Sequence, residues 1–258
     1  MIGGVFLKAE NPKFLSRWYE DHLGIGFGIN VYFSFKWRDI IKTEEIGQTV
    51  LSFFNSDSEY FYPSASNVML NLRVDNLDST RKMLLDQSQY LDEKVDDYDY
   101  GRFGWTMDPC GNKIELWQAI DSGFEDHKKP MELFGKVLCL GGITILCDRP
   151  KDVMDFYSLI FRMDFTSNSY FMNWLELENK NKIGSTFLRF EKDIPENSFG
   201  LKKKCLQTYI VENLKTLLNE LQTSDVSIIQ ELTTSEKTLK VRIADPEGNQ
   251  IELIEYIK

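Results

Sequence analysis

Histidine and cysteine are scarce in this sequence. Among 258 residues there are two histidines, His22 and His127, and four cysteines, no two of which have C-x-x-C spacing. Neither a disulfide framework nor a thiolate zinc site has this pattern, so we expect reduced, buried thiols. Two histidines also give no basis for a Ser-His-Asp arrangement. The cysteines are Cys110, Cys139, Cys147 and Cys205.

Long apolar runs and nucleotide-binding motifs are missing as well. Nowhere is there an apolar run long enough to cross a bilayer, and the first residues lack a basic stretch followed by an apolar one. We therefore expect a cytoplasmic protein with no membrane segment. No G-x-x-x-x-G-K-[ST] sequence is present and no G-x-G-x-x-G opens a helix, so the chain shows no motif for ATP, GTP or NAD(P).

Positive charge is in deficit. Lys and Arg number 30 against 40 Asp and Glu, which leaves a net charge of −10. Binding to a phosphate backbone or to anionic lipid needs a positive field, so we expect neither nucleic-acid nor membrane partners. The run Lys202–Lys204 is too short to change this expectation. An acidic surface would instead attract a cationic small molecule.

What the sequence does contain is an internal repeat. Segments of the first half recur in the second half at a nearly constant offset, which indicates a duplication. The clearest case is Asp-Pro-Cys-Gly-Asn-Lys-Ile-Glu-Leu at 108–116, which returns as Asp-Pro-Glu-Gly-Asn-Gln-Ile-Glu-Leu at 245–253. The other matches are Gly3–Leu7 with Gly141–Ile145 and Trp18-Tyr19 with Phe156-Tyr157.

Each half divides again into two parts with the same order of elements. In the first part, a strand at Val5–Leu7 precedes a helix that Asn11 caps and Pro12 opens. Helical spacing places Trp18 and Tyr19 on the buried face of this helix, and Phe156 and Tyr157 are expected in the core in the same way. The extended stretches that follow are Gly26–Ile29, Val31–Ile40 and Thr49–Phe54.

The second part repeats this order. Its elements are a strand at Val68–Val74, a helix at Leu77–Leu85 and strands at Lys94–Tyr98, Phe103–Met107 and Asn112–Gln118. The segment 108–112 is a hairpin turn, because Pro sets φ while Gly and Asn accept positive φ. The predicted fold class is α+β, with four strand–helix–three-strand (βαβββ) units along the chain.

A polar segment without periodicity, Ile120–Glu132, separates the halves and is predicted to be a linker. We place the first domain at residues 1–120, the linker at 121–132 and the second domain at 133–258. Each domain is long enough to bury a core.

The residues with the most specific pattern are Trp18-Tyr19, His22–Ile25, Val74–Asn76, Gly101–Trp105 and 108–117, with Phe156-Tyr157 and 245–253 in the second half. This pattern resembles the vicinal oxygen chelate superfamily, which includes glyoxalase I, bleomycin-resistance proteins, fosfomycin-resistance enzymes and extradiol dioxygenases. The resemblance covers nearly the whole chain. It implies tandem glyoxalase-like domains, in which paired βαβββ units form open half-barrels around one pocket with the helices outside.

Metal-using members of that superfamily place one ligand on the first strand and one on the last strand of each unit. The corresponding positions are Gly4, Ser52, Met69 and Glu115 in the first half and Gly142, Arg189, Leu206 and Glu252 in the second. Such sites need His, Gln or Glu at three or four positions, and here one Glu per domain remains. The resemblance therefore implies a protein with no metal and no cofactor.

The pocket residues implied by this alignment are Glu115, Trp117 and Ser52 in one domain, or Arg189 and Glu252 in the other. Each Glu is either a base or cation partner in the pocket, or a strand carboxylate held by a hydrogen bond or ion pair. Arg189 points into the same pocket as Glu252, where it either binds an anion or forms a structural ion pair. Trp117 either lines the pocket or belongs to the core.

Three functions remain open. The first is a protein similar to the bleomycin-resistance branch, which binds a cationic or aromatic small molecule in a concave sheet pocket without a metal. The second is a glyoxalase- or extradiol-dioxygenase-like metalloenzyme with a divergent metal site. The third is a scaffold that has lost its ligand. The sequence leaves open whether the chain is a monomer or a homodimer.

Overall fold

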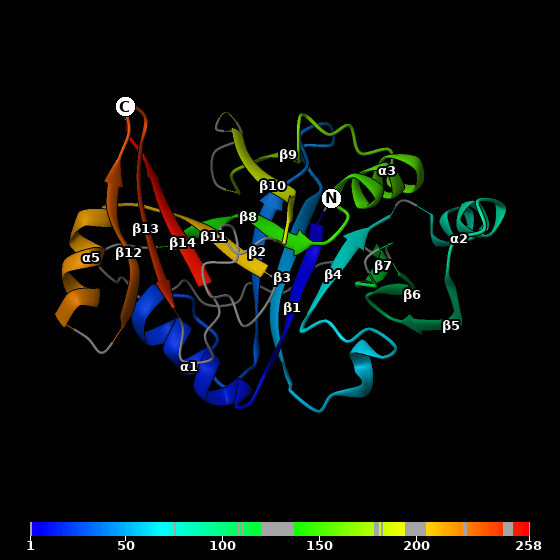
Figure 1. Cartoon of the computed structure of the whole chain (residues 1–258), viewed down its shortest axis with the longest axis horizontal. Coiled ribbons are helices and arrows are strands. Elements are labelled where there is room, and N and C mark those ends of the chain that lie inside the picture. The colour runs from blue at the N-terminus through cyan, green and yellow to red at the C-terminus, as the bar shows by residue number, and fades with distance from the viewer. Residues whose placement is uncertain are drawn as a thin grey trace.

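A computed structural model describes residues 2–74, 76–107, 109, 111–119, 137–177, 181, 183–193, 205–223, 226–244 and 250–257. The elements of the first half are β1 (Ile2–Ala9), α1 (Pro12–Leu23), β2 (Tyr32–Arg38), β3 (Ile46–Asn55), the 3-10 turn η1 (Glu59–Phe61), β4 (Val68–Arg73), α2 (Leu77–Asp86), β5 (Leu91–Tyr98), β6 (Gly101–Met107) and β7 (Lys113–Ala119). Those of the second half are β8 (Val137–Cys147), α3 (Pro150–Phe161), β9 (Ser169–Leu175), β10 (Ile183–Lys192), β11 (Cys205–Val211), α5 (Leu214–Thr223), β12 (Ser227–Thr234), β13 (Thr238–Ala244) and β14 (Gln250–Tyr256). The predicted α+β class is confirmed (Figure 1).

All strands join one mixed 14-stranded sheet, in the order β12-β13-β14-β11-β8-β10-β9-β2-β3-β1-β4-β7-β6-β5 (Figure 1). Each half contributes one continuous set of strands, and the two sets meet where Arg38 of β2 pairs with Leu175 of β9. The pairing within the halves is the same: β1 runs parallel to β3 and antiparallel to β4, while β8 runs parallel to β10 and antiparallel to β11. The duplication in the sequence is therefore a duplication of sheet topology.

The βαβββ order is complete in the second and fourth units, and in the first and third units two strands follow the helix within the described residues. The strand predicted at Gly26–Ile29 is wrong. Gly24 ends α1 with φ 68° and Gly28 has φ 59°, and the N–H of Phe27 donates to the carbonyl of Ile25 over 2.8 Å. Glycine permits these left-handed angles, so the segment forms tight turns instead of a strand.

Helix α1 begins as its sequence predicts. The side chain of Asn11 accepts a hydrogen bond from the N–H of Phe14 over 3.0 Å, and Pro12 occupies the first turn, where its missing N–H costs nothing. The four aromatic residues predicted for the buried faces of α1 and α3 are buried: Trp18, Tyr19, Phe156 and Tyr157.

One apolar core serves both halves. The α-helical side of the sheet carries a single cluster of buried residues, to which both sets of strands contribute. Tyr19 of α1 lies 6.4 Å from Tyr209 of β11, ring centre to ring centre, and accepts a hydrogen bond from the side-chain amide of Gln207 over 2.8 Å. Figure 1 accordingly shows α1, from the first half, close to the strands of the second. The domain boundaries near 120 and 133 stay a prediction.

Several sequence features lie outside the described residues: His127, Cys110, the linker 121–132, Lys202–Lys204 and the turn at 245–249. Of the other cysteines, Cys147 and Cys205 are buried and Cys139 is half-buried, and none of these three forms a disulfide in the described part of the chain. Burial raises the pKa of the Cys205 thiol to about 12. In the parts of the chain that the structure covers, no helix has the length and apolar character to cross a membrane.

Candidate functional site

The side of the sheet turned away from the α-helices, here called the pocket face, carries the positions predicted from the resemblance. In the first half, Phe6 pairs with Ser52 on one side and with Met69 on the other, and Asn71 pairs with Glu115. Paired residues share a face and side chains alternate along a strand. Ser52, Met69 and Glu115 therefore lie on the same face, together with Gly4, which pairs with Asn71.

The second half has the same register. Thr144 pairs with Arg189 and with Leu206, and Thr208 pairs with Glu252. Arg189, Leu206 and Glu252 consequently share the pocket face of this half. Gly142 shares it too, because it pairs with Thr208.

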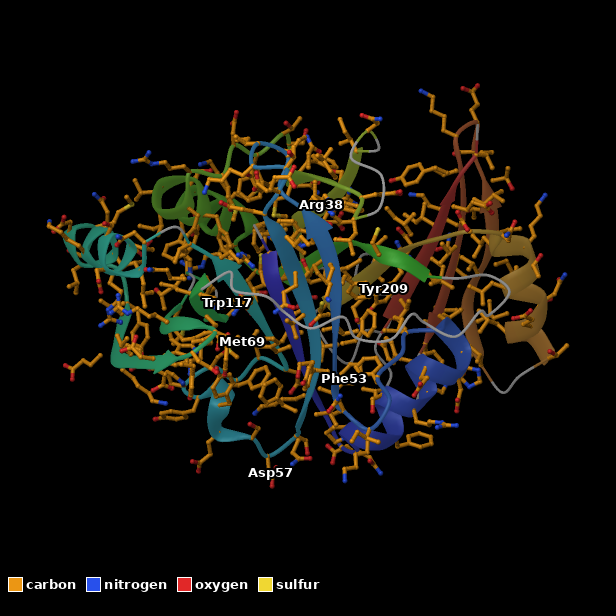
Figure 2. The ribbon with its side chains drawn as sticks, turned by 180° about the vertical axis from the view of Figure 1, so that it is seen from behind. Arg38, Phe53, Asp57, Met69, Trp117 and Tyr209 are labelled. Carbon is orange, nitrogen blue, oxygen red and sulfur yellow. The ribbon has the colours of Figure 1, made fainter. Side chains whose placement is uncertain are left out.

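Aromatic side chains fill the pocket face of the first half. Trp105 and Trp117 are buried in a cluster separate from the main core, in which Phe103 stacks on Trp117 with ring centres 5.7 Å apart. Phe61 of η1 packs into the same cluster and is itself fully buried. The cluster consists of Phe6, Phe61, Met69, Phe103, Trp105 and Trp117, of which Met69 and Trp117 are labelled in Figure 2. Trp117 is thus part of a packed core.

Glu115 is enclosed in this cluster, with 2% of its surface exposed. Its carboxylate accepts hydrogen bonds from the Tyr60 hydroxyl, from Asn71 Nδ2 over 2.5 Å and from Trp105 Nε1 over 3.3 Å. Burial raises the pKa of the Glu115 carboxyl, while these hydrogen bonds act in the opposite direction. Each donor comes from a different element, so the carboxylate ties β7 to η1, β4 and β6.

Lys113 and Tyr60 are two polar neighbours that help to enclose Glu115. Lys113 donates a hydrogen bond from Nζ to the carbonyl of Tyr60 over 2.8 Å, and burial lowers the pKa of its amine. Burial also raises the pKa of the Tyr60 hydroxyl, with the Glu115 charge adding to the effect. Both groups fix η1 over the sheet. Sequence reasoning missed Tyr60 and Phe61, because they lie in a connection that the repeat does not mark.

Ser52 pairs with Phe6 of the cluster and lines a cavity at the edge of the first half. The cavity has a volume of about 530 Å³ and lies where β1 and β3 end and α1 begins. Its lining comprises Glu10, Asn11, Pro12, Lys13, Val31, Ser52, Phe53, Phe54, Asn55, Asp57 and Ser58. A cavity of about 420 Å³ occupies the equivalent place in the second half, lined by Pro150, Met154, Asn168, Phe190, Glu191 and Lys192.

Arg189 is a partly accessible charged group on the pocket face of the second half, with 35% of its side chain exposed. Its Nε donates to the hydroxyl of Ser169 over 2.9 Å, and its guanidinium lies 4.7 Å from the ring centre of Phe187. Its Nη1 also forms an ion pair with the carboxylate of Glu191 over 3.8 Å, which is longer than a hydrogen bond. The guanidinium is therefore held in place on two sides while part of it remains open to a ligand.

Glu252 is paired with Arg242 and not with Arg189. Nε of Arg242 lies 3.0 Å from Oε1 of Glu252, and both side chains are largely buried. Arg189 stands on β10, three strands away from β14 in the sheet order. The sequence analysis missed Arg242. This residue lies on β13, directly opposite Glu252 on β14, and the predicted hairpin between these strands would have placed the two residues side by side.

Thr208 is a second residue that sequence reasoning missed. It lies between Gly142 and Glu252 in the pairing and has 1% of its surface exposed. Its hydroxyl has no hydrogen-bond partner among the described residues. A buried hydroxyl without a partner is costly in a folded protein, so such a group marks a place where a bound molecule could supply the hydrogen bond.

Known proteins resemble this chain in fold but not in sequence. No family model matches the chain, and no curated protein matches its sequence. A solved catechol 2,3-dioxygenase is 17% identical, with 98% of this chain and 87% of that chain covered and a TM-score of 0.57. The Mn(II)-bound glyoxalase from Novosphingobium aromaticivorans is 13% identical, with 98% and 80% covered and a TM-score of 0.58. The 2,3-dioxygenase LapB from Pseudomonas sp. KL28 is 11% identical, with 99% and 92% covered and a TM-score of 0.55.

The chain has the vicinal oxygen chelate fold. At these identities the similarity shows a shared architecture of tandem half-barrel units, as the sequence predicts. The dioxygenase and glyoxalase activities in the names belong to the other proteins.

The donor set does not fit the divalent metal that many proteins of the vicinal oxygen chelate fold hold. Gly4 and Met69 offer no hard donor beside Glu115, and Leu206 and Arg189 offer none beside Glu252. Within the described ranges, no three His, Cys, Asp or Glu side chains come together as metal ligands do.

Proposed function

We propose that the chain binds a small molecule on the pocket face of its second half, without a metal ion. The observation that carries this proposal is Arg189, a guanidinium that Ser169 and Phe187 hold in place while 35% of its side chain stays exposed. An arginine fixed in this way loses little freedom when it binds, and its planar fork matches a carboxylate or phosphate. The ligand we propose carries such an anionic group.

A second polar contact lies across the same face. Thr208 has a buried hydroxyl with no partner in the described part of the chain, and it neighbours the carboxylate of Glu252. Both groups accept hydrogen bonds, which favours a ligand with a hydroxyl or other donor at the end opposite its acid. Adjacent strands lie about 4.8 Å apart, so Arg189 and Glu252 are separated by about 14 Å measured along the sheet.

The test is a protein-observed NMR titration with hexanoate, 6-hydroxyhexanoate and 1-hexanol, in the presence of a chelator. We expect affinity to decrease from 6-hydroxyhexanoate to hexanoate to 1-hexanol. Arg189→Gln should weaken binding of both acids about tenfold, since it removes a charge-assisted hydrogen bond. Arg17→Gln, an exposed arginine on α1 that pairs with Asp21, is the control and should leave binding unchanged.

Two results would overturn the proposal. One is equal binding by the Arg189→Gln variant and the unaltered protein. The other is stoichiometric, chelator-sensitive metal, measured by elemental mass spectrometry after exposure to Zn, Ni, Mn and Fe(II). That second result would favour the glyoxalase- or dioxygenase-like metalloenzyme instead.

We further propose that the protein works in the cytoplasm without nucleic-acid or membrane partners. The net charge of −10 supports this, because it opposes contact with phosphate backbones and anionic lipid. Retention on a DNA–cellulose column at low salt would argue against it.

A further inference from the structure

The cavity at the edge of the first half lies apart from the site proposed above, and we infer that it is a separate binding site for an organic amine with an aromatic or apolar body. Its volume of about 530 Å³ is within the usual size of small-molecule sites. It opens at the carboxyl ends of two parallel strands, β1 and β3, next to the start of α1. The inference does not depend on ligand binding at Arg189.

The first support is Ser52. This residue is 9% exposed, lines the cavity and makes no side-chain hydrogen bond to any residue that the structure describes. The Ser52 hydroxyl is therefore a hydrogen-bonding group at the wall of a cavity, where a ligand can reach it.

The second support is a rigid apolar wall. Phe54 lines the cavity, and its ring stacks on that of Tyr60 with centres 5.3 Å apart and planes at 3°. Its other side contacts the ring of Phe6 at 5.5 Å. Val31 adds an aliphatic surface to the same lining. Phe61 is a third ring neighbour of Phe54, with centres 5.5 Å apart, so the Phe54 ring is fixed in place and offers the cavity a rigid apolar edge.

The third support is charge. Glu10, Lys13 and Asp57 line the cavity, and none of them has an ion pair within the described residues. Figure 2 shows Asp57 on the turn after β3, below Phe53. Two carboxylates against one amine leave a negative balance, and the protein as a whole carries −10. At the start of α1, the side chain of Asn11 accepts a hydrogen bond from the amide of Phe14. The balance favours an ammonium group.

The equivalent cavity of the second half differs at the residues that matter. Arg189 pairs with Thr144 as Ser52 pairs with Phe6, and Glu191 and Lys192 take the places of Phe54 and Asn55 on the parallel strand. In the lining of the second cavity, one carboxylate and one amine thus stand where the first cavity has the Phe54 ring and an amide, and the negative balance of the first cavity is absent. We expect one amine site per chain, in the first half.

Isothermal titration with 2-phenylethylamine tests this inference, with 3-phenylpropionate as the probe of opposite charge. We expect the amine to bind with a stoichiometry of one and the acid not to bind at this cavity. Asp57→Asn should weaken amine binding about two- to fivefold, as expected for a solvent-exposed ion pair, and added salt should weaken it as well. Ser52→Ala should weaken it by a similar factor.

Glu191→Gln in the second cavity is the matched control and should leave amine binding unchanged. Thermal unfolding of each variant shows whether it is folded. The inference is overturned if the amine does not bind, if Asp57→Asn and Ser52→Ala bind it as the unaltered protein does, or if Glu191→Gln weakens it. Arg189→Gln should not affect the amine, so failure here is distinguishable from failure of the site on the second pocket face.

Discussion

Glu115 and Glu252 occupy equivalent places on β7 and β14, and the residues paired with them across the sheet account for the contrast between the two halves. Glu115 has Asn71 on one side and Trp105 on the other, and both donate hydrogen bonds to its carboxylate. Glu252 has Thr208 and Arg242 in those two places. The backbone ladders are alike, so the side chains alone make the difference.

The comparison teaches how a duplicated fold can divide its roles. In the first half, neutral donors and the aromatic rings around them close the face, and the carboxylate becomes part of the core. In the second half, Arg242 neutralises the carboxylate, and the hydroxyl of Thr208 has no hydrogen-bond partner in the described part of the chain. The first face is largely packed with apolar side chains, and the second carries more polar groups, which is why the ligand site is proposed there.

Among the changes proposed here, removal of the Phe61 ring should have the largest effect on the free energy of unfolding. Phe61→Ala takes a fully buried ring out of the cluster that seals the first face, and such changes cost about 3–5 kcal/mol in the free energy of unfolding. Urea denaturation measures the loss. Phe187→Ala on the second face, where the side chain is half-buried, is the control and should cost less than half as much. Equal losses would mean that both faces are sealed.

The pH dependence of stability should separate the two glutamates. Burial raises the folded-state pKa of Glu115, so the folded protein binds more protons than the unfolded chain above its ordinary value of about 4.3. Stability contributed by Glu115 is therefore full below that pH and falls as pH rises towards the folded-state pKa. Glu115→Gln should remove this decline in urea denaturation at a series of pH values. Glu252→Gln should keep it, and the opposite pattern would refute the assignment.

The smallest expected effect on stability is that of a substitution at Thr208. Thr208→Val replaces a buried, unpartnered hydroxyl by a methyl of similar shape, so stability should stay unchanged or rise by up to about 1 kcal/mol. The same variant should lose the preference for 6-hydroxyhexanoate over hexanoate. Asn71→Leu on the first face should instead cost about 1–3 kcal/mol, since it removes a donor from a buried carboxylate. A destabilised Thr208→Val variant would show that the hydroxyl has a structural role.

Much of the fold could be predicted because its signals are local and occur twice. The cap at Asn11, the proline after it and the spacing of Trp18 and Tyr19 each report on one turn of helix. The resemblance to the vicinal oxygen chelate superfamily implied that Ser52, Met69 and Glu115 share a face, and the strand register agrees with that placement. The prediction of a strand at Gly26–Ile29 was wrong, because the glycines at 24, 26 and 28 permit turns that a pattern of apolar residues does not reveal.

The site could be predicted only in part, because its character depends on contacts between distant segments. Nothing in the sequence indicates that Tyr60 and Phe61 fold over Glu115, since the turn that carries them is 3 residues long and lies outside the repeated motifs. Arg242 and Thr208 could be found only from their pairing with Glu252 across the sheet. That Glu252, Arg189 and Ser52 bind a ligand stays a prediction.

The core shared by the two halves has a consequence for folding. Tyr19 of the first half and Gln207 of the second are joined by a hydrogen bond inside one apolar cluster, so neither half can open without exposing the other. We expect the chain to unfold in a single cooperative step, and either half produced alone to aggregate. The aromatic cluster of the first half then helps to keep the second half folded, although the hydroxyl of Thr208 there has no partner among the described residues.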